Sequence, residues 1–358
     1  MELKYNRLLI FDGSYCLHRN LSVPNNWSMI TTSGKRTGGI FGVLRTIYKE
    51  LKTYNYFPVV VFDGGLSQRR LNLYPNYKQH EDKLLNESLE AKSEADLLAE
   101  EFKREYNTQR NDLIELLPAF GIPVIYETGW EGDDLIYILS KLCENSIVVS
   151  DDKDLIQLIH EPDDEDTRLC RIRRALRDEF LDMNSLKEQN LNIKEYIGCK
   201  SIIGDPSDNI PSACYQVGDK TALGLYKLFE NVTKDNIQFP SNEDELNKLC
   251  KKYNITKRKA YLNFNIDQFY TNYLLTDLSL VDEDINDDII NYINVIIDSE
   301  QSNIDINTIL HAFKQFEINS FDYNNLINRI KSLSHVIYTT DKDLCNNVVD
   351  INKKHTLF

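Results

Sequence analysis

Aspartates stand directly after three apolar, β-branched runs of the chain. The runs are Leu8–Phe11 before Asp12, Val59–Phe62 before Asp63, and Ile147–Ser150 before Asp151 and Asp152. A run of about four such residues is typical of a strand buried on both faces, and parallel sheets hold their ligands at the carboxyl ends of the strands. We therefore expect these acids to meet at one edge of a sheet.

Two further acidic clusters follow, Glu131–Asp134 at the start of an apolar helical stretch and Gly204–Asn209 in a later turn. Two carboxylates about 4 Å apart repel each other by roughly 4 kcal/mol at an effective dielectric constant near 20, so such a site needs cations. No histidine or cysteine joins these clusters, and an all-oxygen ligand set favours magnesium or manganese over zinc. The candidate metal ligands are Asp12, Asp63, Glu131, Asp133, Asp134, Asp152, Asp154, Asp205 and Asp208.

Two divalent ions that hold a phosphate between them are a recurrent arrangement for phosphodiester cleavage. The sequence therefore predicts a hydrolase that acts on a phosphate ester. For the acids of Glu131–Asp134 alone, ordinary capping of a helix is the competing interpretation.

The composition limits how such a protein could hold a polyanion. The net charge is −15, and the charge that remains without the candidate carboxylates is still not basic. Any grip on nucleic acid must therefore come from local patches, such as the arginines of segment 168–177 or the lysines and arginine of segment 251–259. The arginines of the first segment either face DNA or solvate a hairpin.

The seven cysteines include no CxxC pair, so neither a disulfide framework nor a zinc site is indicated. No run of about 18 apolar residues appears, and the N-terminus lacks a signal-peptide pattern, which predicts a cytoplasmic protein.

The elements that must position the acids follow from the pattern. Segment 1–65 predicts two strands joined by a helix over Gly39–Tyr54, and Gly121–Ile125 predicts a short strand. Lys83–Leu117 predicts a long charged helix, either packed on the sheet or arching over the site. Segment 191–335 is mainly helical, and a mobile tail is expected from about residue 339.

The order of the motifs resembles the 5′ nuclease or flap endonuclease superfamily, and within it the bacteriophage enzymes, those of T-even phages in particular. The motifs are Phe11-Asp12-Gly13, Phe62-Asp63-Gly64, Tyr77-Lys78, Glu131-Gly132-Asp133-Asp134, Ser150-Asp151-Asp152-Lys153-Asp154, and Gly204–Pro211 leading to Gly218–Ala222.

This resemblance implies an α/β fold with a central, mainly parallel sheet flanked by helices. The nuclease domain would span residues 1–190, with a helical arch at about 66–117. A mainly helical DNA-binding domain would follow at 191–335, with a helix-three-turn-helix at about 202–227. Residues 336–358 would form a flexible tail.

The resemblance also implies the site and its cofactors. Asp12, Asp63, Glu131 and Asp133 would surround a first Mg²⁺ ion, with Asp134 nearby. The second ion would be served by Asp152, Asp154, Asp205 and Asp208, several of them through water, and Mn²⁺ would substitute. The side chains expected to carry the catalysis are Lys78, Asp12, Asp133 and Asp154.

The implied activity is a structure-specific 5′ to 3′ exonuclease and flap endonuclease that removes RNA primers and 5′ flaps during DNA replication. Its partners would be DNA with a 5′ flap or nick, or an RNA–DNA hybrid, bound by a monomer in the host bacterial cytoplasm. The terminal Leu357-Phe358 either tethers the protein to a sliding clamp or single-strand DNA-binding protein, or is a chance apolar pair.

The residues implied to contact DNA are Arg70, Lys78, Lys83, Gly218, Lys220 and Thr221. Lys78 lies at the base of the arch, whereas Arg70 is either a helper of Lys78 or a plain surface charge. Two positions depart from the family: Glu81 stands where many relatives have arginine, and Ser212–Val217 replaces a glycine-rich turn. The second departure leaves open whether this turn binds K⁺.

Two other functions remain alternatives. A phosphatase or phosphotransferase would use Asp12 as a covalent nucleophile, but Ser14 stands where a second acid would be expected. A non-catalytic module that binds branched DNA would not need the full set of acids.

Overall fold

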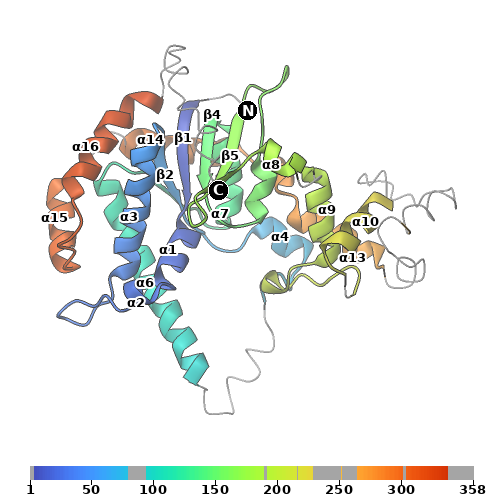
Figure 1. Cartoon of the computed structure of the whole chain (residues 1–358), viewed down its shortest axis with the longest axis horizontal. Helices are drawn as coiled ribbons and strands as arrows, with labels where there is room; N and C mark the ends of the chain where they lie inside the picture. The colour runs from blue at the N-terminus through green and yellow to red at the C-terminus, as the bar shows by residue number, and fades with distance from the viewer. Residues whose placement is uncertain are drawn as a thin grey trace.

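The computed structural model describes residues 4–79, 94–188, 192–215, 217–228, 251, 264–300 and 304–337. Its centre is a six-stranded sheet in the order β3-β2-β1-β4-β5-β6 (Figure 1). Neighbouring strands pair in parallel except for β5 and β6, which are antiparallel. This confirms the predicted α/β class. The strands are β1 Tyr5–Asp12, β2 Phe57–Val61, β3 Val124–Ile125, β4 Cys143–Val149, β5 Leu169–Arg174 and β6 Glu179–Leu181.

The three apolar runs form the three central strands, as predicted. Phe11 of β1 is aligned with Val149 of β4, and Asp12 is aligned with Val61 of β2. Because these strands are parallel and in register, the residues that follow them emerge at the same edge. Asp12, Asp63 and the turn after Val149 therefore lie at the carboxyl edge of the sheet.

Helices surround this sheet and complete its core. Figure 1 shows α3, α15 and α16 on one side of the strands and α9, α10 and α13 on the other. The α/β part contains α1 Gly13–Leu21, α2 Pro24–Trp27, α3 Gly38–Thr53, α4 Gln68–Leu73, α6 Glu94–Ala119, α7 Gly132–Lys141 and α8 Met183–Glu188. The later helices are α9 Ile193–Ile203, α10 Asp219–Leu228, α13 Ile266–Thr276, α14 Asp287–Glu300, α15 Ile306–Gln315 and α16 Tyr323–Leu333.

The segment predicted as one helical domain contributes to two cores. Cys199, Ile202, Leu225 and Phe269 pack together in a small core formed by α9, α10 and α13. Buried residues of α14, α15 and α16 instead join the large core that contains the sheet. The helices α9 and α10 lie on either side of the loop that begins at Gly204, and the helix-three-turn-helix expected at about 202–227 stays a prediction. The tail beyond residue 337 lies outside the described residues.

The charged helix predicted at Lys83–Leu117 is seen as α6, although its first residues, 83–93, lie outside the described part. The first turns of α6, residues 94–100, are exposed and extend away from the body (Figure 1). Farther along, Arg36 pairs with Glu101, and the buried Gln109 accepts a hydrogen bond from the backbone N–H of Ile40. The helix therefore packs on the body with its second half, as one of the two interpretations expected, and projects from it with its first, while the arch over the site stays a prediction.

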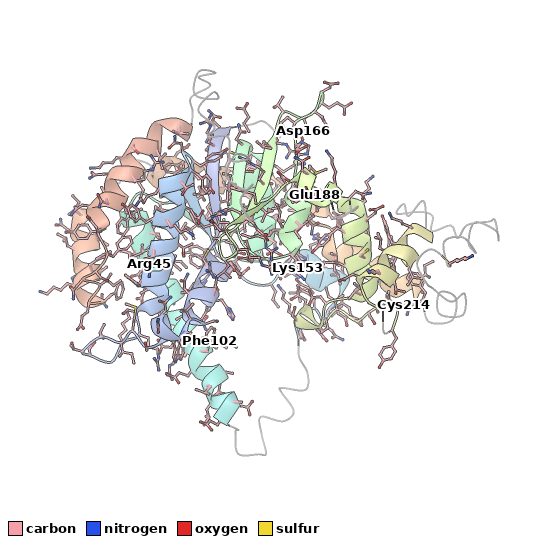
Figure 2. All side chains as sticks on the ribbon, in the orientation of Figure 1. Arg45, Phe102, Lys153, Asp166, Glu188 and Cys214 are labelled. Atoms are coloured by element: carbon pink, nitrogen blue, oxygen red, sulfur yellow. The ribbon has the colours of Figure 1, made fainter. Side chains whose placement is uncertain are left out.

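The small helical core also contacts the acidic edge directly. The Tyr196 hydroxyl on α9 donates a 2.7 Å hydrogen bond to the carbonyl of Lys153, within the Ser150–Asp154 motif. Figure 2 shows Lys153 between the sheet and the group of α9, α10 and α13.

The described cysteines, Cys16, Cys143, Cys170, Cys199 and Cys214, are buried free thiols, as predicted. Within the described residues, no helix combines the length and the apolar character needed to cross a membrane.

Candidate active site

Asp12 ends β1 and begins α1 at the acidic edge. Its carboxylate caps the helix by accepting a 2.9 Å hydrogen bond from the Tyr15 N–H, and the Ser150 hydroxyl donates to its other oxygen at 2.9 Å. Burial raises the pKa of Asp12 to about 7, and the charges of Asp63 and Asp152 act in the same direction. A cation bound here would relieve this repulsion.

Asp63, Asp133 and Asp152 extend this group. Asp63 accepts a 2.8 Å hydrogen bond from the N–H of Gly132, so it lies against the first turn of α7. Burial and the neighbouring charge of Asp152 raise the pKa of Asp133 well above its ordinary value. Burial and the charge of Asp154 raise the pKa of Asp152. We call Asp12, Asp63, Asp133 and Asp152 the unpaired acids, because none of them forms an ion pair with a described lysine, arginine or histidine.

The other five candidates each have a cation of the protein beside them, and we call them the paired acids. Glu131 and Asp134 pair with Arg70, Glu131 and Asp208 with Lys78, and Asp154 and Asp205 with Lys200.

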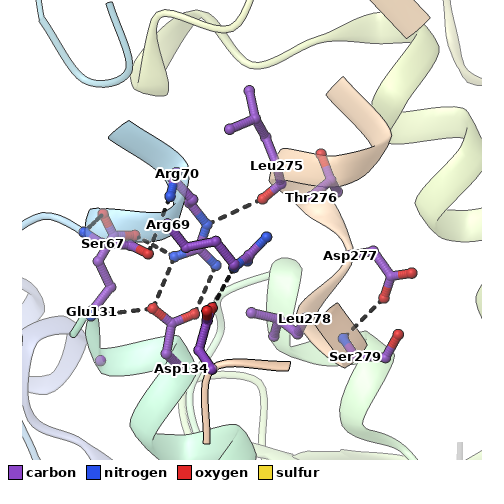
Figure 3. A network of polar contacts seen from close by, with 12 residues as sticks. Ser67, Arg69, Arg70, Glu131, Asp134, Leu275, Thr276, Asp277, Leu278 and Ser279 are labelled. Carbon is purple, nitrogen blue, oxygen red and sulfur yellow. Dashed lines mark hydrogen bonds and ion pairs between the residues drawn. The ribbon is translucent and has the colours of Figure 1, made fainter. Parts of the chain in front are cut away.

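Arg70 is the most buried of these cations. The prediction that it is either a DNA contact or a surface charge is wrong, because its side chain is only 3% exposed and is bound to Glu131 and Asp134 (Figure 3). Burial by itself lowers the pKa of Arg70, but the charges of Asp134 and Glu131 outweigh it and raise that pKa above its ordinary value. A guanidinium held in this way cannot reach a duplex.

Glu131 is fully engaged by donors. Its Oε2 accepts hydrogen bonds from Arg70 at 2.9 Å, Tyr77 at 2.9 Å and Lys78 at 3.0 Å, and Oε1 accepts one from the N–H of Ser67 at 3.3 Å. Asp134 accepts a hydrogen bond from the N–H of Glu131, so the helix-capping interpretation is confirmed for this residue.

Lys78 occupies a strained turn that follows α4. Its φ of 55° lies in the left-handed region, and its N–H donates to the carbonyl of Asp208 at 2.8 Å. Asn209 adds two side-chain hydrogen bonds to the same turn, to the carbonyls of Asn76 and Gln79. The loop between α9 and α10 thus fixes the backbone of Lys78, as expected for a charge that must be aimed.

Lys200 is a residue of this site that the sequence did not predict. It lies on α9, forms a close ion pair with Asp154, and approaches Asp205 to 3.5 Å. Burial lowers the pKa of Lys200, but the charge of Asp154 outweighs it and raises that pKa. The available signal was its position as the one charged residue in the otherwise uncharged stretch Tyr196–Ile203.

The unpaired acid Asp133 and the paired acids Asp154, Asp205 and Asp208 line a small polar cavity of about 20 Å³, together with Lys200 and other residues. This volume is enough for one water molecule. Among the described residues no three carboxylates, histidines or cysteines are grouped closely enough to enclose a metal ion. Magnesium does not need such a cage, since it retains several waters and binds through one or two carboxylates and substrate phosphates. The oxygen-only donors and the mutual repulsion of the unpaired acids fit this ion.

The remaining predicted DNA contacts are placed unequally. Gly218 and Lys220 are exposed and Thr221 is partly exposed, around the start of α10. Lys83 and most of the basic segment 251–259 lie outside the described residues. Arg173 is 4% exposed and bonded to Glu50 and Asp178, so neither proposed role, facing DNA or solvating a hairpin, fits it.

Comparison with known proteins decides the family. Residues 7–190, more than half of the chain, match the model of the 5′–3′ exonuclease N-terminal, resolvase-like domain. The chain belongs to the 5′–3′ exonuclease family. This confirms the predicted superfamily and the predicted enzyme class, a nuclease that cleaves phosphodiesters.

Relatives of this 5′–3′ exonuclease family member agree with the assignment. The 5′–3′ exonuclease of Buchnera aphidicola subsp. Acyrthosiphon pisum is 29% identical over 238 residues, which cover 64% of this chain and 73% of the relative. The flap endonuclease of bacteriophage T5, solved with DNA and metal ions, aligns with a TM-score of 0.56 at 20% identity and covers 81% of this chain and 97% of its own. Flap endonuclease-1 of Methanococcus jannaschii aligns with a TM-score of 0.52 at 16% identity, covering 92% of each chain. The likeness to these two structures concerns the fold.

Proposed function

We propose that this exonuclease is a magnesium-dependent, structure-specific nuclease that removes RNA primers and 5′ flaps during DNA replication. The observation that carries the proposal is the set of unpaired acids at the sheet edge of a 5′–3′ exonuclease. The relatives include DNA polymerase I of Bacillus subtilis, which is 29% identical over 236 residues and supports a role in replication. The T5 flap endonuclease, solved with DNA and metal ions, supports a flap substrate.

The unpaired acids Asp12, Asp63, Asp133 and Asp152 would hold the divalent ions most directly. Asp154, Asp205 and Asp208 would join them through water or after Lys200 and Lys78 move. Bound magnesium would supply an activated water for attack and stabilise the negative charge that develops on the phosphate. We propose that Glu131 and Asp134 orient the site, because Glu131 already accepts hydrogen bonds from Arg70, Tyr77 and Lys78, and Asp134 pairs with Arg70.

The protein's own cations have separate tasks in this scheme. Lys78, partly exposed at the base of the arch, would leave Asp208 and donate to an oxygen of the scissile phosphate. Lys200 would keep Asp154 and Asp205 together until the ions and the DNA arrive. The hydrogen bonds from Tyr15 and Ser150 favour the ionised form of Asp12, and a bound divalent ion would favour it further.

DNA would be held mainly through its backbone. The N–H groups at the start of α10 point out of the helix and can bind a phosphate, next to the exposed Lys220. Such binding recognises the shape of the duplex and not its base sequence, and it explains how an acidic protein holds DNA. Three points stay predictions: recruitment of a sliding clamp or single-strand DNA-binding protein by the tail, the monomeric state, and the cytoplasmic location. Binding of K⁺ at this turn stays an open question.

The test is cleavage of a 5′-labelled flap oligonucleotide in magnesium, in manganese and in chelator. Cleavage near the junction that disappears with chelator is the expected result. Cleavage that persists in chelator contradicts the metal mechanism. Release of phosphate from p-nitrophenyl phosphate without flap cleavage would support the phosphatase alternative, and flap binding without cleavage would support the non-catalytic module.

A further inference from the structure

Arg70 connects three parts of the molecule that are far apart in the sequence. Its Nη1 donates to Glu131 at 2.9 Å and to Asp134 at 3.1 Å, and its Nη2 lies 2.9 Å from the other oxygen of Asp134. Its Nε donates to the carbonyl of Leu275 at 3.1 Å, in the last turn of α13 (Figure 3). The guanidinium on α4 therefore joins the start of α7 to the end of α13.

These contacts hold Glu131 and Asp134, the acids that come before and after Asp133 in the sequence. Glu131 and Asp134 are 2% and 1% exposed, whereas Asp133 is partly exposed and lines the polar cavity. The planar guanidinium presents its donors in a rigid fork, which can fix two carboxylates at defined positions in a way that a lysine ammonium cannot. Fixing Glu131 and Asp134 fixes the first turn of α7 and the direction of Asp133.

The contact with α13 links Arg70 to α9 and α10, the helices that flank the proposed DNA-binding loop. The last carbonyls of a helix have no partner within the helix, and Arg70 satisfies the one at Leu275. On the same helix, Asn272 donates to the carbonyls of Ser201 and Pro211, at the end of α9 and in the loop that follows. The guanidinium thus forms a short path between that loop and the acids.

We propose that Arg70 is a positioning residue for the metal site, which acts through Glu131 and Asp134 and locks the first turn of α7 to α13. In this role it acts through the two carboxylates that it binds. The inference rests on the proposed function, because it takes Asp133 as a metal ligand.

Arg69 provides a matched control on the same helix. Its side chain donates to the carbonyl of Leu274 at 2.8 Å and pairs with Asp284 at 3.3 Å. It shares the attachment to α13, but the described contacts include no hydrogen bond or ion pair between Arg69 and either Glu131 or Asp134. Replacing either arginine with lysine keeps the charge and removes the fork.

The experiment compares Arg70→Lys with Arg69→Lys in the full chain. Mn²⁺ binding to the DNA-free protein is measured by electron paramagnetic resonance, and kcat and KM are measured on a 5′-flap oligonucleotide. Because the loss of a group that orients a metal ligand typically costs 10- to 100-fold, Arg70→Lys should weaken Mn²⁺ binding and lower kcat by at least about 10-fold. Arg69→Lys should change both by less than about 2-fold, and KM should stay near the wild-type value in both variants.

Equal effects of the two substitutions, or unchanged Mn²⁺ binding in Arg70→Lys, would overturn the proposal and leave Arg70 as a structural link only. If circular dichroism shows that Arg70→Lys does not fold, the Mn²⁺-binding measurement is repeated with Tyr77→Phe, which tests the proposal instead. It removes the hydroxyl that donates to the same Glu131 oxygen and that also lies 3.3 Å from Asp208. It should weaken Mn²⁺ binding by about 3-fold, whereas no change contradicts the proposal. Failure of the wild-type protein to bind Mn²⁺ would instead contradict the proposed function.

Discussion

The unpaired and paired acids lie at the same edge of the sheet but balance their charge in different ways. The paired acids have Arg70, Lys78 and Lys200 beside them. The unpaired acids repel one another, and burial raises the pKa of Asp12, Asp133 and Asp152 further. The paired acids are thus balanced within the protein, whereas the unpaired acids would gain stability from protons or added cations.

This difference separates two kinds of work. We propose that acids with a cation beside them hold the backbone until the substrate binds, whereas acids without one attract the divalent ions. The distinction predicts that substitutions in the two groups differ in size and in kind. The following experiments test it, from the largest expected effect to the smallest.

Asp133→Asn should lower the single-turnover rate of flap cleavage by about 100-fold, because it removes a proposed metal ligand from the unpaired group. Flap binding in Ca²⁺, measured by fluorescence anisotropy, should stay close to wild type, since the duplex contacts lie elsewhere. The matched variant Asp205→Asn keeps the rate closer to wild type if the distinction is correct. An equal loss in both variants would mean that the two groups act as one.

Magnesium should stabilise the DNA-free protein against unfolding, because it binds the folded site and relieves the repulsion there. At 100 times the dissociation constant, the gain is about 2.7 kcal/mol, measurable as a shift of the thermal midpoint. Asp133→Asn should lose most of this shift and Lys200→Met should retain it. A wild-type midpoint that does not respond to magnesium contradicts the role assigned to the unpaired acids.

Lys78→Ala should slow single-turnover cleavage by about 10-fold while affinity for the flap changes much less, because a charge aimed at the scissile phosphate acts chiefly in the transition state. Stopped-flow cleavage and equilibrium binding on the same substrate separate the two quantities. A loss confined to affinity would reassign Lys78 to general attraction of DNA.

Lys200→Met should have the smallest effect. Removing the ammonium leaves Asp154 and Asp205 without their cation, which should lower the unfolding free energy in chelator by about 1 kcal/mol, since the group is partly exposed to solvent. Urea denaturation with and without magnesium checks this, and the deficit should shrink when magnesium is present. A deficit of equal size in both conditions would show that Lys200 serves packing and not charge balance.

Much of the site could be predicted from local sequence. Strands that are buried on both faces must be apolar, so the acids after Phe11, Phe62 and Ser150 were visible as interruptions of a pattern. Parallel pairing then places them at one edge, and the structure confirms this register. The oxygen-only ligand chemistry followed from residue type alone.

The partners of those acids could not be predicted in the same way. Arg70 and Lys200 look like surface charges in the sequence, because nothing local records that α4 packs against α13 or that α9 reaches the turn after β4. Their ion pairs with Asp134 and Asp154 span 64 and 46 residues. The sequence by itself determined which acids meet and which ions suit them. Only the tertiary structure decided which acids the protein balances with its own cations, because ion pairing depends on distances that packing alone creates.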